Sequence, residues 1–210
     1  MNAELVSLLR ANLDRPLSPD LAADICIAAS AMERLVEAGA LERIRRARHA
    51  DFVFALERIE DITDEIRPLH QAHWQETEAH RHGLLFRPDY ATFVQYERAG
   101  RYVLLTARRG NRLLGNCAMY LDRSAHTQTL IATEDTLYLL PEARARGVAR
   151  RFVAYVEQAM RSLEVREINV TVKTVNKAGR FFQMLGYRHV ENGLTKILEA
   201  EHVQFETPAP

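Results

Sequence analysis

The sequence predicts a mixed α/β (α+β) domain, in which a mostly antiparallel sheet is flanked by helices and preceded by a helical extension. Three observations predict this class. Hydrophobic residues make up 47% of the 210 residues and charged residues 27%, which suits one core of ordinary domain size. Short apolar runs of strand length are separated by segments with helical periodicity. In the second half, a strand leads through a helix into another strand, as in a crossover connection.

Residues 1–50 are interpreted as the helical extension. Ser18, Pro19 and Asp20 predict a helix start, because a hydroxyl cap, an early proline and an acid all favour that end. Apolar residues then recur at helical spacing as far as Val36. Gly39 is expected to break this helix, and residues 41–49 are expected to form a second short one.

Residues 51–200 carry the pattern of the sheet domain, and residues 201–210 form a loose tail. Gly and Asn at the turn near position 110 predict a hairpin between two apolar runs. The expected elements are a strand at 52–56, helices at 61–78 and 88–99, the hairpin at 102–121, a strand at 130–140, a helix at 147–163, a strand at 167–172, a helix at 177–185, and final strands at 187–191 and 194–198.

Composition excludes several classes of protein. Lys and Arg number 28 and Asp and Glu number 28, which argues against whole-surface binding of nucleic acid or anionic membrane. The basic run at residues 43–48 is interpreted as a solvated helix end, with a nucleic-acid contact as the alternative. Cys26 and Cys117 are too few for a disulfide framework, and neither a membrane span nor a leader pattern is expected. We therefore expect a cytoplasmic protein.

One segment of the second half concentrates charge around a helix start. A strand ends near Leu140, a short loop follows, and a helix begins at Gly147. The first turn of a helix has unpaired N–H groups, and glycine lets a phosphate approach them closely. The segment predicts a phosphate or pyrophosphate site, with an arginine-rich surface turn as the alternative. No nucleotide-hydrolysis or dinucleotide motif is present. The charged residues are Arg144, Arg146, Arg150 and Arg151.

Two motifs resemble those of the GNAT family of N-acetyltransferases. Arg144-x-x-Gly147-x-Ala149, which follows Leu137-Tyr138-Leu139-x-Pro141, resembles the acetyl-CoA motif Gln/Arg-x-x-Gly-x-Gly/Ala. The run from Asn176 to Tyr187, NKAGRFFQMLGY, resembles a later helix of the family. The element order of residues 51–198 fits the same family, and the chain is also similar to acetyltransferase-like proteins of tailed phages. Residues 1–50 lie outside the resemblance.

The resemblance implies acetyl-CoA as cosubstrate, and no metal is expected. It implies that the strand at Leu137, Tyr138 and Leu139 splays from its neighbour and faces the pantetheine arm, and that the Leu139 N–H stabilises the oxyanion. It also implies that Asn176 faces the arm and Phe182 packs near the thioester. The pyrophosphate would be wrapped by Arg144, Arg146, Gly147, Val148, Ala149, Arg150 and Arg151.

The candidate catalytic base is one of two neighbouring acids. By resemblance to relatives, Asp135 is favoured and Glu134 is second. Successive strand residues face opposite sides, so only one can enter the cleft unless a bulge intervenes. Solvated edge carboxylates are the alternative. Phe182 stands where many relatives carry a tyrosine and cannot donate a proton. Another group such as Tyr138, or water, would then protonate the thiolate, or turnover would be weak or absent.

The acceptor is expected to meet the region between the first two helices of the domain. Trp74, Glu78 and His80 are the candidate acceptor-binding residues, because acids and imidazoles favour a cationic or amine acceptor. A metal site at His70, His73, Glu76 and His80 is an alternative whose spacing matches no strong zinc signature. The plainest alternative is a half-buried helix with exposed imidazoles and Trp74 in the core.

The predicted function is an acetyl-CoA-dependent N-acetyltransferase that acts on an amine-bearing acceptor by direct attack on the thioester. The alternative is a CoA-binding module of weak or no activity that acts through protein interaction. A homodimer is left open. Neither a membrane nor a nucleic acid is expected as a partner.

Overall fold

A computed structural model describes residues 3–30, 34–77, 85–145, 147–174 and 178–196 of the chain. Within these residues, one sheet of six strands has the order β1-β2-β3-β4-β5-β6. All neighbouring strands are antiparallel except the parallel pair β5 and β6, which confirms the predicted mixed, mostly antiparallel sheet. The strands are β1 (Ala47–His49), β2 (Phe52–Leu56), β3 (Tyr102–Arg109), β4 (Arg112–Arg123), β5 (Leu130–Leu139) and β6 (Glu167–Asn169).

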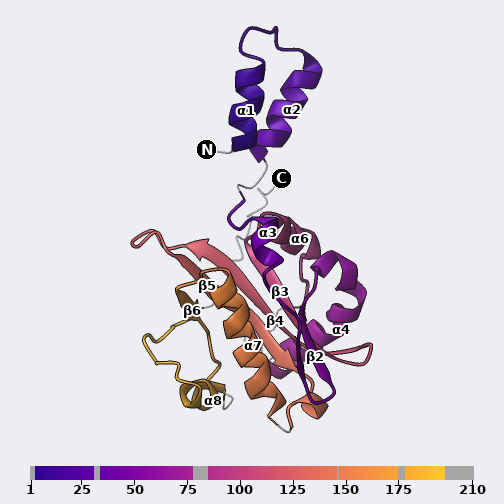
Figure 1. Cartoon of the computed structure of the whole chain (residues 1–210), viewed down its shortest axis with the longest axis vertical. Helices are drawn as coiled ribbons and strands as arrows, with labels where there is room; N and C mark the ends of the chain where they lie inside the picture. Colours follow the sequence, from indigo (N-terminus) through magenta and orange to yellow (C-terminus); the bar gives the residue numbers. More distant parts are fainter. Residues whose placement is uncertain (1–2, 31–33, 78–84, 146, 175–177, 197–210) are drawn as a thin grey trace, which may run out of the picture.

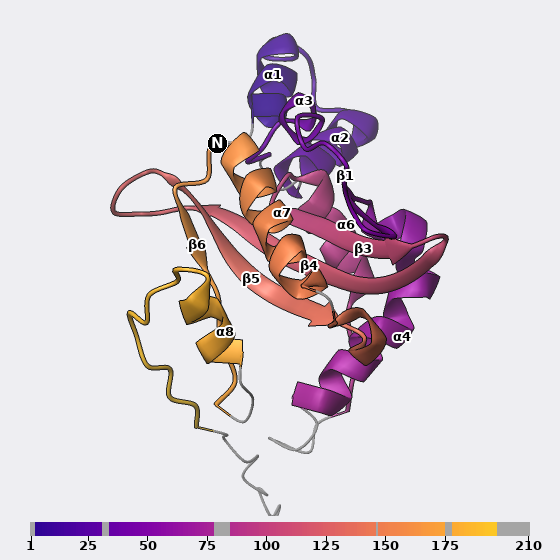
Figure 2. The ribbon, with the colours of Figure 1, turned by 60° about the horizontal axis from the view of Figure 1, so that its bottom comes forward.

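Helices cover both faces of this sheet. Figure 2 shows α7 on one face and α4 with α6 on the other. The helix connecting β5 to β6 is α7, so the predicted crossover is confirmed. The helices are α1 (Ala3–Ala11), α2 (Pro19–Ser30), α3 (Ala38–Leu41), α4 (Ile59–Thr77), α6 (Tyr90–Arg98), the 3-10 turn η1 (Pro141–Ala143), α7 (Val148–Ser162) and α8 (Ala178–Met184).

The alternation of side chains along the strands divides the apolar residues between two cores. On one face, Leu105 of β3 packs in a cluster with Phe152 of α7. On the other face, Leu104 and Tyr138 pack in a cluster with Ile66 of α4. The second core places α4 against the end of β5, which is where the predicted site begins.

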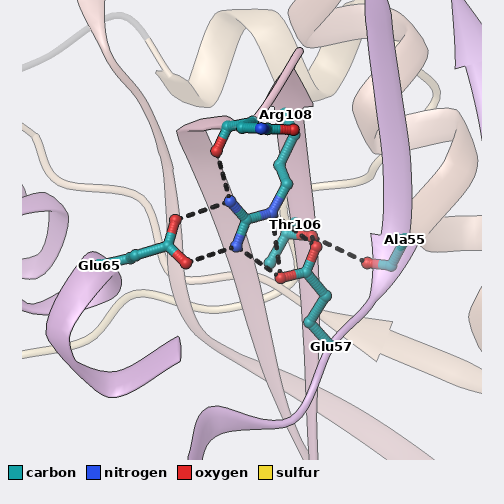
Figure 3. A network of polar contacts seen from close by, with 6 residues as sticks. Ala55, Glu57, Glu65, Thr106 and Arg108 are labelled. Carbon is teal, nitrogen blue, oxygen red and sulfur yellow. Dashed lines mark hydrogen bonds and ion pairs between the residues drawn. The ribbon is translucent and has the colours of Figure 1, made fainter. Parts of the chain in front are cut away.

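An ion-pair network anchors the first half of α4 to the sheet (Figure 3). The Arg108 guanidinium on β3 donates to Glu57, just after β2, from Nε at 2.8 Å. It also donates from Nη1 to Glu65 of α4 at 2.7 Å. Thr106 donates to the same Glu57 carboxylate at 2.9 Å and to the Ala55 carbonyl at 3.3 Å. The network therefore fixes where α4 leaves the sheet.

A β-bulge interrupts β5 in the middle of the predicted site. Ala118 of β4 pairs with Thr136, but the next residue, Met119, pairs with Glu134. Asp135 is therefore the extra residue of the bulge. Bulges re-aim side chains and bend a strand, and they occur next to active sites.

Beyond the bulge, β5 loses its neighbour on one side. The β5–β6 pairing ends with Thr133 opposite Asn169, whereas β5 continues to Leu139. Figure 2 shows the two strands diverging, with α8 beyond β6. The last residues of β5 therefore have an edge that β6 does not cover.

Several sequence-based expectations about elements are wrong. Gly39 does not break a helix that begins near Ser18, because α2 spans Pro19–Ser30, residues 34–37 are not helical, and Gly39 lies inside α3. The strand expected at 167–172 ends at Asn169.

Residues 41–49 are not a helix, because Ala47–His49 pair with β2 as β1. Ala50, with φ of +54°, lies in the tight turn between the two strands, and this pairing overrides the helical propensity of the arginine-rich segment. The final strands at 187–191 and 194–198 are absent from the described residues up to 196. Residues 187–196 pair with none of the six described strands, so they lack the ladder hydrogen bonds that define a strand.

The chain ahead of position 50 contributes both to the sheet domain and to a separate hairpin. Figure 1 shows α1 and α2 side by side beyond one end of the sheet. Helix α2 begins at Pro19 as predicted, with the Ser18 hydroxyl accepting from the Leu21 N–H at 3.2 Å. Val36 is buried in the core beneath α7. A Cβ on Gly100 would lie 2.1 Å from the Val36 carbonyl oxygen, so only glycine fits there. No helix in the described residues is long and apolar enough to cross a membrane.

Candidate active site

The open edge of β5 presents backbone groups of Leu139. The Leu140 N–H donates to the Leu114 carbonyl on β4 at 2.8 Å. Successive amides along a strand point to opposite sides, so the Leu139 N–H points away from β4. In agreement, a Cβ on Gly115 of β4 would lie 2.8 Å from the Tyr138 carbonyl oxygen, which places that carbonyl on the β4 side. The Leu139 N–H, predicted to be the oxyanion donor, thus lies on the side of β5 that β6 does not cover.

The start of α7 has the geometry that the glycine predicts. Gly147 is the N-cap residue with φ of +76°, a left-handed conformation that favours glycine, and no described side chain caps the helix. Val148 is buried, Ala149 is half-buried, and Arg150 and Arg151 are exposed on the first turn. The positive helix end and two exposed guanidinium groups suit a diphosphate. Arg146, also predicted for this site, lies outside the described residues.

Arg144 joins the loop to both β5 and α4. Its Nε donates to the Leu139 carbonyl at 2.8 Å, and its Nη2 donates to Glu76 Oε2 of α4 at 2.7 Å. The Tyr138 hydroxyl donates to the same Glu76 oxygen at 3.1 Å, and the Tyr138 ring lies 5.2 Å from the guanidinium carbon. The Arg144 hydrogen bond is the main cause that lowers the pKa of Glu76, and burial opposes it. Arg144, predicted to hold pyrophosphate, therefore has an internal anionic partner in the free chain.

The two candidate bases lie on different sides of β5. Asp135 Oδ2 accepts from the hydroxyl of Tyr102 at 3.0 Å, which directs Asp135 toward the α4 and α6 face. Burial raises the pKa of Asp135, and the Tyr102 hydrogen bond opposes that shift. Glu134 is paired with Met119, whose side chain lies in the α7 core. The carboxylate of Glu134 accepts from the backbone N–H of Thr171, just beyond β6. Glu134 thus lies at the gap between the diverging strands.

The pKa of Glu134 is raised to about 7, chiefly because burial disfavours the charged form. The backbone N–H groups of Thr171 and Leu137 oppose this shift, as does the charge of Lys173, whereas the neighbouring Asp135 raises it further. A carboxyl group with a pKa near neutral can accept a proton at physiological pH and release it again.

His70 belongs to a buried polar cluster beneath the sheet. Its Nδ1 lies 3.2 Å from the Tyr90 hydroxyl, and its Nε2 lies 3.3 Å from the Asn116 amide nitrogen, which also donates to Thr136 at 2.8 Å. Burial, with the charge of His73 adding, lowers the pKa of His70 to about 4, so the ring is neutral at pH 7. Among the described residues, no cluster of three or more His, Cys, Asp or Glu side chains could hold a metal.

The expected acceptor residues lie at the end of α4 as far as the structure describes them. Trp74 is half-buried, with its ring 5.9 Å from the Phe86 ring. Glu78 and His80 lie outside the described residues. Glu76 and Tyr138 were not predicted to interact, because nothing in a sequence reports a contact between residues this far apart. Figure 2 shows the end of α4 and α8 on opposite sides of the end of β5.

Phe182, predicted to pack near the thioester, is buried on α8. It is 6% exposed and packs edge-on against Tyr187 at 5.0 Å between ring centroids. Burial, followed by the charge of Glu157 on α7, raises the pKa of Tyr187. Asn176, predicted to face the CoA arm, lies outside the described residues.

Comparisons with known proteins agree with this geometry. The model of the Acetyltransferase (GNAT) family matches residues 59–187, which is more than half of the chain. No curated protein matches the chain by sequence.

Several solved structures share the fold at low sequence identity. One is an aminoglycoside acetyltransferase from an uncultured soil metagenomic sample, solved with sisomicin, with 12% identity and a TM-score of 0.56 over 71% of this chain and 96% of that one. A second is a ribosomal-protein-alanine N-acetyltransferase from Brucella melitensis biovar Abortus 2308, with 18% identity and a TM-score of 0.54 over 71% and 99%. A third is an acetyltransferase from Trypanosoma brucei, with 15% identity and a TM-score of 0.54 over 70% and 100%.

Proposed function

The chain belongs to the GNAT acetyltransferase family, and we propose that it transfers an acetyl group from acetyl-CoA to an amine. The observation that carries this proposal is the open edge of β5, which leads into the loop and the glycine-capped start of α7. An extended thioester arm can pair with a free strand edge as a peptide does. A diphosphate is favoured at a helix N-terminus. The chain thus offers a strand edge for the thioester arm and, directly after it in the sequence, a helix N-terminus for the diphosphate.

Residues of the β5 edge, the loop after it and the start of α7 would hold acetyl-CoA. The Leu139 N–H and the Leu137 carbonyl would pair with the arm, since the Leu139 carbonyl accepts from Arg144 and the Leu137 N–H donates to Glu134. Phe182 with Asn176 would close the opposite side. The diphosphate would lie at the start of α7, within reach of charged and small residues. Those described by the structure are Arg144, Gly147, Val148, Ala149, Arg150 and Arg151, and Arg146 is proposed with them.

Acetyl-CoA supplies an acetyl group that is activated as a thioester, and the chain supplies groups that assist its transfer. The Leu139 N–H would donate to the thioester oxygen as negative charge develops there. Glu134, with its pKa of about 7, would accept the proton of the attacking amine. Asp135, held by Tyr102, would act on Glu134 through its charge.

The leaving thiolate also needs a proton, and Phe182 cannot supply one. We propose that Glu134 returns the proton it has accepted, directly or through water. A thiol has an ordinary pKa of about 8.5. The thiolate is therefore a stronger base than the Glu134 carboxylate, whose pKa is about 7, and proton transfer to the thiolate is favourable by about 1.5 pKa units, or roughly 30-fold.

The acceptor is proposed to approach the end of α4. Trp74 and Glu76 lie there, and Glu78 and His80 belong to the same predicted set. Carboxylates at a binding surface raise the local concentration of cations, so they favour an amine acceptor. The first amines to test are those named for proteins of the same fold: sisomicin and a peptide that begins with alanine.

Calorimetric titration with acetyl-CoA tests the binding step, and release of free thiol with these amines tests turnover. We expect binding in the micromolar range and thiol release with at least one amine. Gly147→Val is the matched variant, since a branched residue at φ of +76° is strained and would block the approach of a phosphate. Absence of binding at about 1 mM acetyl-CoA would overturn the proposal. Binding without thiol release over a broad amine panel would favour a CoA-binding module.

A further inference from the structure

One contact in the site joins the two halves that the proposed function keeps separate. Glu76 lies near the end of α4, on the acceptor side, and Arg144 lies in the loop before α7, on the diphosphate side. Their side chains meet at 2.7 Å although they are 68 residues apart in the sequence. Both are partly solvated, with 45% of the Glu76 side chain and 41% of the Arg144 side chain exposed.

The remaining bonds of Arg144 hold it at the end of the open β5 edge. Its Nε is committed to the Leu139 carbonyl at 2.8 Å. The Nη2 atom is the one that contacts Glu76. A guanidinium group can keep one bond and change the partner of another, because its five N–H donors point in different directions. Arg144 can therefore exchange its anion without leaving β5.

Such an exchange is favourable on electrostatic grounds. A half-exposed ion pair is weak, since water and salt screen it and two long side chains must be ordered. A diphosphate brings more negative charge than one carboxylate, and it bonds in a bidentate manner with arginine. The carboxylate and the diphosphate compete for the same guanidinium charge, and two anions held next to it repel each other.

We propose that Glu76 is an internal anion that occupies Arg144 in the free protein and that the diphosphate of the cosubstrate displaces. This inference rests on the proposed function, since it concerns the same diphosphate site. Displacement frees the Glu76 carboxylate and the Tyr138 hydroxyl, which shares it at 3.1 Å. Both groups then face the acceptor side of β5. Cosubstrate binding thereby frees a carboxylate that can attract a cationic acceptor.

The direction in which one substitution changes CoA affinity distinguishes this exchange from a purely structural ion pair. Glu76→Gln keeps the size and the hydrogen bonds of the side chain but removes its charge. If Glu76 competes with the diphosphate, the variant binds CoA more tightly. If Glu76 only positions Arg144, the variant binds CoA equally well or more weakly.

The experiment is calorimetric titration of CoA into the full chain at low salt. Glu76→Gln is expected to lower the dissociation constant about three- to tenfold. Glu142→Gln is the matched control: it removes one carboxylate charge from η1, two residues before Arg144, but the partner of Glu142 is Arg112, at 2.8 Å. The control is expected to change the constant less than about twofold, because solvent screens an exposed charge. Thermal unfolding checks that both variants are folded.

A double-mutant cycle then tests whether the effect of Glu76 on CoA binding acts through Arg144. Arg144→Gln alone is expected to weaken CoA binding, and adding Glu76→Gln to it should give no further gain. An unchanged or higher dissociation constant for Glu76→Gln would overturn the exchange while leaving the proposed function intact. An equal gain from Glu142→Gln would also overturn it, by showing a general charge effect. Failure of the unmodified protein to bind CoA would overturn both proposals.

Discussion

Glu134 is the residue whose environment most directly sets a measurable pH dependence. A base must be deprotonated to act, so kcat/KM, which reports the free enzyme, is expected to rise with pH through about 7 and to level off above it. Glu134→Gln should lower kcat by about 100-fold or more and remove this rise. The pH–rate profile of both proteins measures the effect. Asp135→Asn is the comparison, since Asp135 acts on Glu134 through charge: it should shift the midpoint to lower pH and keep the rise. A profile unaltered by Glu134→Gln would reject this assignment.

Two buried groups give the folding stability opposite dependences on pH. The pKa of Glu134 is raised to about 7, so its contribution to stability is present below the unfolded value of 4.5 and is lost as pH rises through 7. The pKa of His70 is lowered to about 4, so its contribution is present above 6.5 and is lost as pH falls through 4. Between about pH 4.5 and 6.5, the contribution of Glu134 to stability falls with rising pH, whereas that of His70 increases.

Removing either group should reveal the slope of the other. Glu134→Gln is expected to give a protein whose stability rises from pH 4 to 6.5, and His70→Gln one whose stability falls from about pH 4.5 to 7. Urea unfolding at a series of pH values measures both. Two variants with the same slope as the unmodified protein would show that neither shift exists.

At the scale of elements, the position of α4 depends on Arg108. Its side chain is 17% exposed, and it bridges Glu57 and Glu65 from two different elements. Arg108→Met would leave two carboxylates facing each other, one of them mostly buried, which should reduce the free energy of unfolding by about 2–4 kcal/mol. Arg109→Met is the control on the same strand, because Arg109 is 39% exposed and lies 3.8 Å from Asp51. The control should lose less than about 0.5 kcal/mol. Equal losses in denaturant unfolding would contradict the anchoring role.

The elements with a strong local pattern are the ones the sequence predicts correctly. The hairpin of β3 and β4, the helices α4, α6, α7 and α8, and the start of α2 all agree with the structure. Their periodicity, caps and turns are local, so they can be read from neighbouring residues. β1 was not predicted, because its conformation comes from pairing with β2 and not from its own arginine-rich sequence. The site motif was identified by its resemblance to a family motif, whereas the contact of Arg144 with Glu76 and that of Asp135 with Tyr102 depend on long-range folding.

At the scale of the whole molecule, strand pairing is nearly continuous from β1 to β5 but covers only part of β5 on the β6 side. β1 to β5 are paired along most of their length, whereas β6 covers only the first part of β5. Figure 1 places the hairpin of α1 and α2 beyond one end of the sheet, away from α8. The catalytic chemistry we propose therefore needs no contribution from that hairpin.

The uncovered end of β5 also has a consequence for handling the protein. An unpaired strand edge is a template on which another chain can add, so a solution without ligand is expected to self-associate slowly during storage. A small molecule that lies along the same edge would act as a cap against such growth. Light scattering of concentrated samples, followed over days with and without CoA, should show clear solutions for longer when the ligand is present.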